Sequence, residues 1–388
     1  MPLETQLTKG ALDRAGDVLR NDNSDSPKIS DNSDRQAALR ILSIRRLGHV
    51  PVLAAFRALL LDVARSYSDS LAGKEQDAFV AMRLKCLVSI ELKLRRLKTR
   101  LSRMQDLAGL RVVLPTVDDV RAFHEALLNA DVSAMGSMSS MSSMSAESLP
   151  AKDYIASPKA DGYRSIHQVF RCRDETLSGP QDLYVEVQIR THLQHAWATA
   201  VETYGAIERM SLKTGEGTED TRRFFALASA LLSHKEGTPV REEFEGFTLR
   251  ELGRDFSELE AKLGVFDTLL GAPLEARNVI GEAGDYTLMR LDLTRGELAL
   301  TPFEAEEAAT ACDRYLSTET RCLGDASKLV VLVSAEAAAA YAAGDHVDRA
   351  DPVDPAGRLG ILPAAYPNYV LDARPFVEAM RSILAEVR

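Results

Sequence analysis

The chain has 388 residues, of which 45% are hydrophobic, and its formal net charge is −10. This composition supports two or three packed domains and excludes a protein that binds nucleic acid over its whole surface. No apolar run near 18 residues and no signal-peptide pattern is found, so we expect a cytoplasmic protein without a membrane partner. The four cysteines are widely spread, which argues against a disulfide framework and a four-ligand zinc site.

The N-terminal part is predicted to be helical. Apolar residues recur at helical intervals within 8–20 and again within 35–65, with a polar stretch rich in Ser, Asp and Asn between them. Pro51 interrupts the second pattern, so two helices are expected to meet near it. His49 is interpreted as a loop or core histidine rather than a ligand.

Residues 83–103 are strongly basic, with one acid, Glu91, among them. Apolar residues at helical spacing, beginning at Leu84, predict a helix with one stripe facing the core. Most charge runs are solvated helix faces, but this excess on an acidic protein needs a counter-charge, which phosphates can supply. The basic residues are Arg83, Lys85, Lys93, Arg95, Arg96, Lys98, Arg100 and Arg103.

Two predicted strands carry carboxylates at neighbouring ends. Asp106 precedes a strand over 110–114, and in a second strand, 182–191, apolar residues alternate with Tyr184, Glu186, Gln188 and Arg190. One face of the second strand is therefore core, and the other is predicted to be a ligand site. Asp106 and Glu186 together would suit Mg²⁺ shared with substrate phosphates. A lone Asp before a strand is usually a cap, so this assignment depends on Glu186.

A turn runs into the strand that follows it. Gly162 allows a tight bend, Tyr163 offers a stacking face, and Lys159, Arg164 and His167 offer cations to phosphate. We interpret this turn as a nucleotide pocket; for each residue alone, the alternative is a polar loop with a packed tyrosine. The low-complexity residues 133–148 just before it are expected to be a mobile loop.

The remaining elements are predicted from periodicity and turn signals. Helices are expected over 118–130, 192–204, 222–234 and 249–270, then a hairpin over 285–302, a helix over 304–316, a strand over 328–334, a helix over 335–342, a loop over 344–363 and a final helix after Tyr369. The last third is therefore expected to be a small C-terminal α/β domain.

Four segments occur in one order between 83 and 202: RLKCLVSIELKLR, MQDLAGLRV, YIASPKADGYRSIH and EVQIRTHLQHAWATAVE. Together they resemble the synthetase domain of the RelA/SpoT family of alarmone synthetases. The resemblance implies an α/β (α+β) fold, a mixed β-sheet of the nucleotidyltransferase type flanked by helices. The expected divisions are a helical region at 1–78, the pyrophosphokinase domain at 79–248, a connecting helix at 249–272 and a regulatory, antitoxin-like α/β domain at 273–388.

The same resemblance implies transfer of the β,γ-pyrophosphate of ATP to a ribose 3′-hydroxyl, with Mg²⁺ as cofactor. On the ATP side it assigns Arg83 and Arg111 to the adenine, Lys85, Ser89 and Lys93 to the phosphates, Asp106 and Glu186 to the metal, and Glu186 to the role of base. On the acceptor side it assigns Tyr163 to base stacking, and Lys159, His167, Gln188 and Arg190 to phosphates and ribose, with His195 nearby. No His-Asp dipeptide occurs, so we expect a synthetase without the hydrolase domain of the long family members.

The flanking segments LTKGALDRAGDVLR, RRFFALASALLS and AYPNYV resemble the toxic small alarmone synthetases, especially the fused toxin–antitoxin type that responds to phage. Members of that group modify the 3′ CCA end of tRNA, and other toxic relatives make adenosine alarmones. By this resemblance, Tyr366 and Tyr369 would block the adenine site near Arg83 and Arg111, and a phage protein would act as trigger at the C-terminal domain. The alternative is that both tyrosines are the packed start of the last helix.

Three functions therefore remain open. The first is a toxin that modifies tRNA and inhibits itself through its C-terminal domain, and the second is a (p)ppGpp synthetase acting on GDP or GTP. The third is a catalytically decayed regulatory module that senses phage. The presence of Asp106, Tyr163 and Glu186 argues against the third.

Overall fold

The computed structural model describes most of the chain. The described residues are 7–21, 32–70, 79–130, 144–174, 182–208, 210, 212, 215–271, 278–280, 286–292, 295, 297–304, 307–322, 328–334 and 373–387. The predicted helix over 335–342, the loop over 344–363 and both Tyr366 and Tyr369 lie outside them.

A mixed β-sheet forms the centre of the molecule, which confirms the predicted fold class. Its strand order is β1-β2-β6-β5-β3, with β4 paired to β5, and only β2 and β6 run parallel. The strands are β1 Phe79–Leu84, β2 Ala108–Leu114, β3 Met144–Ser148, β4 Lys152–Asp153, β5 Ile166–Asp174 and β6 Leu183–Thr191.

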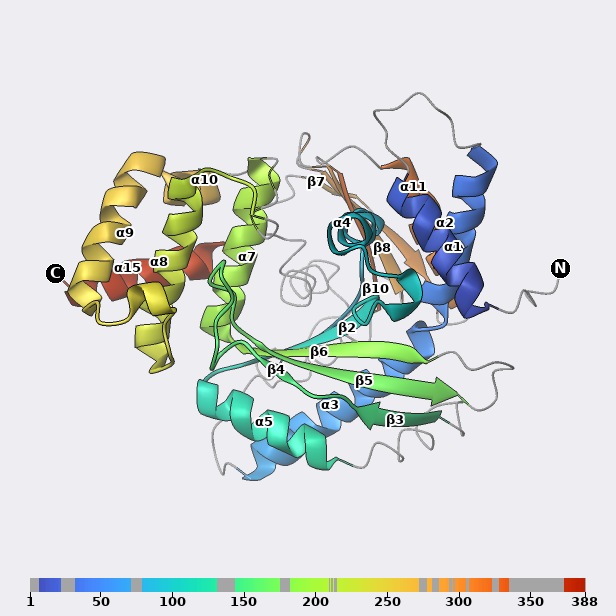
Figure 1. The fold of residues 1–388 in the computed structure, drawn as a ribbon, viewed down its shortest axis with the longest axis horizontal. Helices are drawn as coiled ribbons and strands as arrows, with labels where there is room; N and C mark the ends of the chain where they lie inside the picture. Colours follow the sequence, from blue (N-terminus) through green and yellow to red (C-terminus); the bar gives the residue numbers. More distant parts are fainter. Residues whose placement is uncertain are drawn as a thin grey trace, which may run out of the picture.

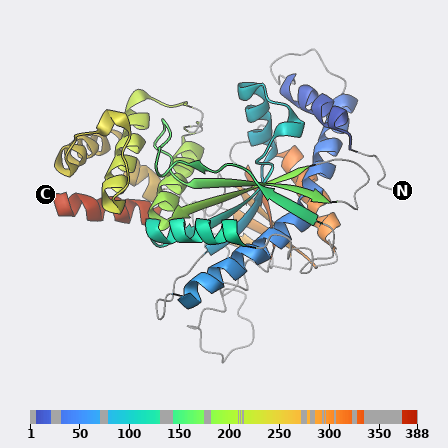
Figure 2. The same cartoon turned by 60° about the horizontal axis from the view of Figure 1, so that its bottom comes forward.

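Helices α3 (Val50–Ser70) and α5 (Val117–Asn129) cover one face of this sheet (Figure 2). Apolar side chains on both helices pack against Val185, Val187 and Ile189 of β6, all fully buried. The alternation predicted for 182–191 is thus confirmed, with its apolar side in the core. Residues 33–66 are apolar enough to span a bilayer by length and composition alone, yet 60% of the most apolar window is buried within the fold.

A helical cluster lies beside the sheet, on the left of Figure 1. It contains α7 His192–Ile207, α8 Glu219–Glu236, α9 Leu249–Leu263, α10 Val265–Gly271 and the C-terminal helix α15 Arg374–Val387. Gly264, with φ of +62°, ends α9, so the helix predicted over 249–270 is two helices. Phe376 and Met380 of α15 are fully buried in this cluster.

The N-terminal helices lie at the opposite side. Helices α1 (Lys9–Asn21) and α2 (Asn32–Leu47) share a core with α4 (Leu87–Leu97) and the 3₁₀ turn Leu101–Arg103. Helices α2 and α3 meet at residues 48–49, as predicted. His49 is 1% exposed and donates from Nδ1 to the Arg45 carbonyl, and burial lowers its pKa to about 3, so it is a core histidine.

A second, four-stranded sheet is formed by strands between residues 278 and 334. Its strands are β7 Asn278–Ile280, β8 Tyr286–Asp292, β9 Glu297–Phe303 and β10 Lys328–Ser334, in the order β10-β8-β9-β7. Strands β8 and β9 form the predicted hairpin. Helix α11 (Ala308–Arg321) packs on this sheet and also contacts α2, so the second sheet and its helix lie against the N-terminal helices (Figure 1).

Two local predictions were wrong. Residues 79–84 form a strand, so the helical stripe does not begin at Leu84 but after Cys86; antiparallel pairing with β2 overrides the helical pattern there. Residues 144–148 form β3 on the edge of the sheet rather than part of a mobile loop, because they pair with β5.

Candidate active site

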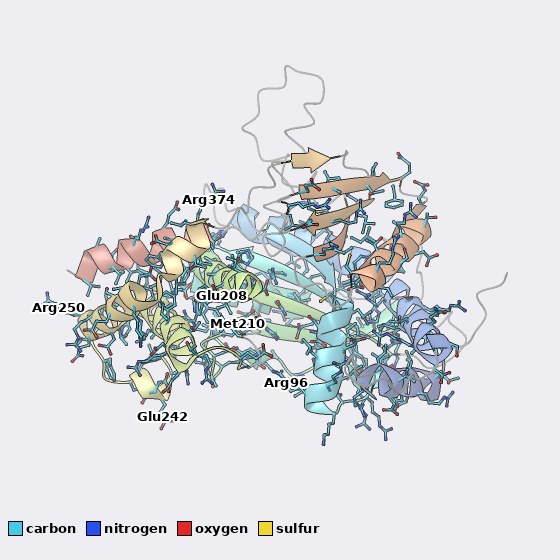
Figure 3. The ribbon with its side chains drawn as sticks, turned by 90° about the horizontal axis from the view of Figure 1, so that it is seen from above. Arg96, Glu208, Met210, Glu242, Arg250 and Arg374 are labelled. Carbon is cyan, nitrogen blue, oxygen red and sulfur yellow. The ribbon has the colours of Figure 1, made fainter. Side chains whose placement is uncertain are left out.

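One cavity of about 690 Å³ opens between α4 and the polar face of the central sheet. Figure 3 shows Arg96 on the edge of α4 that faces the helical cluster. Glu208 and Met210 lie on the side of that cluster that faces α4 (Figure 3). Most of the predicted site residues line this cavity: Lys85, Ser89, Lys93, Asp106, Arg111, Lys159, Tyr163, His167, Glu186, Gln188 and Arg190. Segments more than 100 residues apart in the chain therefore converge on one space.

Asp106 is the centre of a buried ion-pair cluster. Its Oδ2 atom lies 3.1 Å from Lys85 Nζ and 2.7 Å from Lys93 Nζ. Burial alone would raise the pKa of Asp106, but the two ammonium groups lower it below its usual range. Its Oδ1 atom is buried and has no hydrogen-bond partner among the described residues, so this oxygen lacks the partner that a buried carboxylate oxygen normally has.

Glu186 is held by two neighbours on the sheet. Its Oε1 atom lies 3.0 Å from His167 Nδ1, and its Oε2 atom accepts a hydrogen bond of 2.8 Å from Gln188 Nε2. The other nitrogen of His167 lies 2.8 Å from the Tyr163 hydroxyl. Burial lowers the pKa of His167, which favours the neutral ring. From its partners we assign the tautomer in which Nδ1–H donates to Glu186 and Nε2 accepts from Tyr163.

Strand pairing places the two carboxylates close together. Glu186 lies opposite Gly109 in the parallel β2–β6 pair. It is in the interior of β6, whereas the sequence predicts it at a strand end. A side chain at 109 would meet the Glu186 carbonyl oxygen at 3.0 Å, so glycine allows this close approach. Asp106 precedes β2 by two residues and lines the same cavity.

The aromatic wall of the cavity is occupied by a lysine. The Lys159 ammonium lies 4.2 Å from the ring centroid of Tyr154 and 4.7 Å from that of Tyr163. Tyr154 also contacts His167 edge-to-face and was not singled out from the sequence, because it lies before the motif turn. Tyr163 is 9% exposed, so a base that stacks on it would have to exchange with Lys159.

The predicted turn is present at Gly162, whose φ is +90°. A side chain there would lie 2.9 Å from Ser229 Cβ, so only glycine fits. Arg164, however, is 2% exposed and turns away from the cavity, donating 2.9 Å to the Ser229 carbonyl and pairing with Glu236. Its predicted role as a cation for phosphate was wrong, since its charge is used to join the turn to α8.

The remaining predicted residues have different positions. Arg190 is 1% exposed and contacts His195 Nδ1, and His195 lies behind it at the start of α7 rather than on the cavity wall. Burial and the charges of Arg190 and Arg111 place the pKa of His195 well below its usual value, so the ring can accept from Arg190. Arg83, on β1, pairs with Gly109 of β2, but the side chain of Arg83 is outside the described part of the structure.

Much of the basic stretch is neutralised within the protein. Lys85 and Lys93 pair with Asp106, Arg95 pairs with Glu91, and Arg100 pairs with Asp13. Carboxylates of the protein therefore supply part of the counter-charge that this stretch was predicted to need. Arg96, Lys98 and Arg103 form no ion pair within the described residues, and of these Arg96 lines the cavity.

The site fits a magnesium ion shared with a phosphate ligand. Within the described ranges no three His, Cys, Asp or Glu side chains group as a complete metal cage. Two carboxylates do line the cavity, and Asp106 Oδ1 is free of a protein partner there. Mg²⁺ is typically held by one or two carboxylates and completed by water and phosphate oxygens. Asp106 and Glu186 would be those two ligands.

A second cavity of about 670 Å³ adjoins the first. Arg96, Lys159, Asp161 and Trp197 line both cavities. The second continues along α8, where its walls include Arg222, Arg223 and Arg241 as well as Glu219 and Glu243. The sequence did not reveal this space: Arg222 and Arg223 begin the flanking segment RRFFALASALLS, but its sequence gives no sign that it lies beside α4.

Comparison with known proteins identifies the region that contains the site. Residues 82–206 match the family model described as "Region found in RelA / SpoT proteins". Over 125 residues the chain is 37% identical to the GTP pyrophosphokinase YjbM of Bacillus subtilis (strain 168), covering 31% of this chain and 53% of that protein. Over 151 residues it is 30% identical to the probable GTP diphosphokinase CRSH, chloroplastic, of Arabidopsis thaliana, covering 37% and 24%.

The matched region thus spans about half the length of the bacterial relative and a quarter of the plant one. Among solved structures, the small alarmone synthetase 1 from Bacillus subtilis bound to its product pppGpp is 25% identical, with a TM-score of 0.40. The comparison covers 56% of this chain and 96% of that one.

The contact between His167 and Glu186 can be tested by titration. Burial lowers the pKa of His167, while the Glu186 carboxylate raises it, so Glu186→Gln is expected to lower this pKa further. NMR titration of the imidazole ring measures it in both proteins, with Glu147→Gln on the exposed edge strand β3 as control. An unchanged or higher pKa in Glu186→Gln would contradict the assigned contact.

Proposed function

We propose that this protein is an ATP-dependent pyrophosphokinase, which transfers the β,γ-pyrophosphate of ATP to a ribose 3′-hydroxyl. The observation that supports it most is the convergence of Asp106, its two lysines and Glu186 in one cavity with the Tyr163 turn. These residues lie within the region that matches RelA/SpoT proteins. Two relatives named for this kind of activity point the same way.

The residues suit the chemistry of this transfer. The 3′-oxygen attacks the β-phosphorus of ATP, the bond from that phosphorus to the α,β-bridging oxygen breaks, and AMP leaves. Glu186 accepts the hydroxyl proton, and His167 with Gln188 holds its carboxylate in place. Lys85 and Lys93 neutralise phosphate charge, for which they leave Asp106 Oδ2.

Mg²⁺ bound by Asp106 and Glu186 would neutralise the phosphate oxygens further and orient the ATP chain. Asp106 is suited to this exchange, because its pKa is already lowered and it stays ionised when the lysines turn to phosphate. When Lys85 and Lys93 turn from Asp106 to the phosphates, Mg²⁺ would replace them as the counter-charge of this carboxylate. Asp106 would then not be left buried as an unpaired charge.

The proposed reaction is tested with ATP labelled in its γ-phosphate. Label transferred to an acceptor offered as GDP, GTP, ATP or bulk tRNA is measured with the full chain and Mg²⁺. Glu186→Gln is expected to lower transfer by about 100-fold or more, since a positioned base is lost. Glu147→Gln on β3 is the matched control and should keep wild-type transfer. No transfer by the wild type to any acceptor would favour a decayed regulatory module instead.

For the acceptor we propose the 3′ CCA end of tRNA, so that the protein is a translation-inhibiting toxin of anti-phage defence. The second cavity supports an acceptor larger than one nucleotide, because it extends the acceptor side past Lys159 and Trp197. Arg222 lines it and forms no ion pair in the part of the chain that is described, so its charge suits a backbone phosphate. ATP and tRNA are both cytoplasmic, which agrees with the expected location.

Arg222→Gln tests this acceptor. It is expected to weaken tRNA use several-fold and to lower the salt dependence of tRNA binding by about one unit of log–log slope, while GDP and GTP use is unchanged. Arg250→Gln, on the exposed start of α9 (Figure 3), is the matched control. Equal losses with tRNA and free nucleotides would contradict a separate RNA path.

The second candidate is a (p)ppGpp synthetase acting on GDP or GTP. The names of the two relatives favour it, as does the pppGpp bound in the solved small alarmone synthetase 1. The same cavity and the same catalytic residues serve either acceptor. Label on guanine nucleotides alone in the transfer assay would establish this function in place of the first.

We further propose that Tyr366 and Tyr369 inhibit ATP entry, as the resemblance implies. Tyr366→Ala with Tyr369→Ala in the full chain is expected to raise transfer. A trigger, for which we keep the expectation of a phage protein at the C-terminal domain, would then stimulate the wild type but not the double variant. Unchanged transfer by the double variant would contradict inhibition. Truncation is unsuitable, because α15 supplies Phe376 and Met380 to the helical core.

A further inference from the structure

Helix α4, which carries Ser89 and Lys93, receives its N-terminal cap from the C-terminal domain. Its own N-cap residue, Cys86, makes no side-chain capping hydrogen bond to a backbone N–H of the helix, because its Sγ donates to the Ser89 hydroxyl at 3.0 Å. The backbone N–H of Leu87 instead donates to Glu319 Oε1 of α11 at 2.6 Å, across 232 positions of sequence. A first-turn N–H has no partner within its own helix, and a carboxylate is the favoured partner at that end.

Arg46 of α2 extends this contact to Lys85. Its guanidinium donates 2.8 Å to Glu319 Oε2, 2.7 Å to the Lys85 carbonyl and 2.7 Å to the Tyr315 hydroxyl. The side chains of Arg46 and Glu319 are only 1% and 8% exposed. Removing either charge would leave the other buried without its counter-charge, so the pair holds its geometry strongly.

The backbone of Lys85 is consequently fixed on both sides. Its N–H donates 2.8 Å to the Leu107 carbonyl, and its own carbonyl accepts from Arg46. Its side chain reaches Asp106 in the cavity. The position of this ammonium therefore depends on Arg46, which depends in turn on Glu319.

Glu319 does not touch the cavity itself. Neither Glu319 nor Leu87 is among the residues that line it, and Leu87 is 2% exposed. Glu319 therefore holds the N-terminal end of α4 from outside the ligand space. Its carboxylate supports the helix and does not occupy the place of a phosphate.

We propose that Glu319 is a positioning residue for ATP, which holds Lys85, Ser89 and Lys93 in the arrangement that receives the ATP phosphates. This inference rests on the proposed pyrophosphokinase function. It makes the C-terminal sheet domain a support of the ATP site. Because coupling between binding events is reciprocal, bound ATP also tightens the docking of α11.

Glu319→Gln in the full chain tests the proposal, since glutamine keeps the size and one acceptor but removes the charge opposite Arg46. The KM for ATP and the dissociation constant of a non-hydrolysable ATP analogue with Mg²⁺ are expected to rise about tenfold or more, because misplaced binding groups lose much of their effect. The KM for the acceptor should stay within twofold. A loss of fold alone would lower the active fraction without this split.

Asp313→Asn, exposed on the same helix α11, is the matched control and should leave both constants unchanged. Tyr315→Phe removes only the hydroxyl that Arg46 and Glu319 share, and should raise the KM for ATP by a smaller factor if Glu319→Gln folds poorly. An unchanged affinity for the ATP analogue in Glu319→Gln and Tyr315→Phe, or an equal rise in both KM values, would overturn the proposal.

Different results would contradict the pyrophosphokinase function and the positioning role of Glu319. If the wild type binds no ATP analogue and transfers no label, the proposed function is wrong and Glu319 has no ATP to position. If the wild type is active and Glu319→Gln binds the analogue as tightly, only the positioning role is wrong.

Discussion

The parallel pairing of β2 with β6 is the constraint on which the site depends. It sets Gly109 opposite Glu186. Because Gly109 has no side chain, the two strands can approach each other closely at Glu186. The antiparallel pairing of β5 with β6 then brings His167 opposite Gln188 and within reach of Glu186. A register shift of one residue on β6 would turn the side chains of Glu186 and Gln188 into the core beneath the sheet. The apolar residues between them, buried against α3 and α5, prevent that shift.

Charge balance in the cavity is the second condition. Buried ions are stable only with partners, and the structure supplies them before any ligand arrives: two lysines for Asp106, two hydrogen bonds for Glu186, aromatic faces for Lys159. In the proposed reaction a phosphate, a metal ion or a nucleobase would replace one of these partners in each case. No charged group would then be left unpaired beside the apolar core. The contrast is Arg164, whose partners on α8 are fixed parts of the fold and face no cavity.

The sequence predicted the parts of the site that depend on local pattern. Alternation along β6 and the glycine turn at 162 are local signals, whereas the fold class was implied by the family resemblance that the four ordered motifs carry. What it missed depends on tertiary pairing. Leu84 fits the helical stripe of the residues after it but pairs with β2 as the end of β1, and Arg164 is a cation like Lys159 yet points to the other side of the turn. The neutralisation of Arg100 by Asp13 and the second cavity along α8 both join segments that no motif links.

The C-terminal region is attached on both sides of the cavity, and this limits how it can regulate the site. On one side Glu319 and Arg46 hold the start of α4, next to the lysines. On the other side Phe376 and Met380 of α15 are buried against the helices that carry the acceptor-side wall. The proposed inhibition by Tyr366 and Tyr369 and the proposed support through Glu319 are therefore different effects of one region. Under these proposals, a signal that displaced the two tyrosines alone would let ATP bind, whereas one that pulled α11 away would also release the cap of α4 and disturb the lysines beside it.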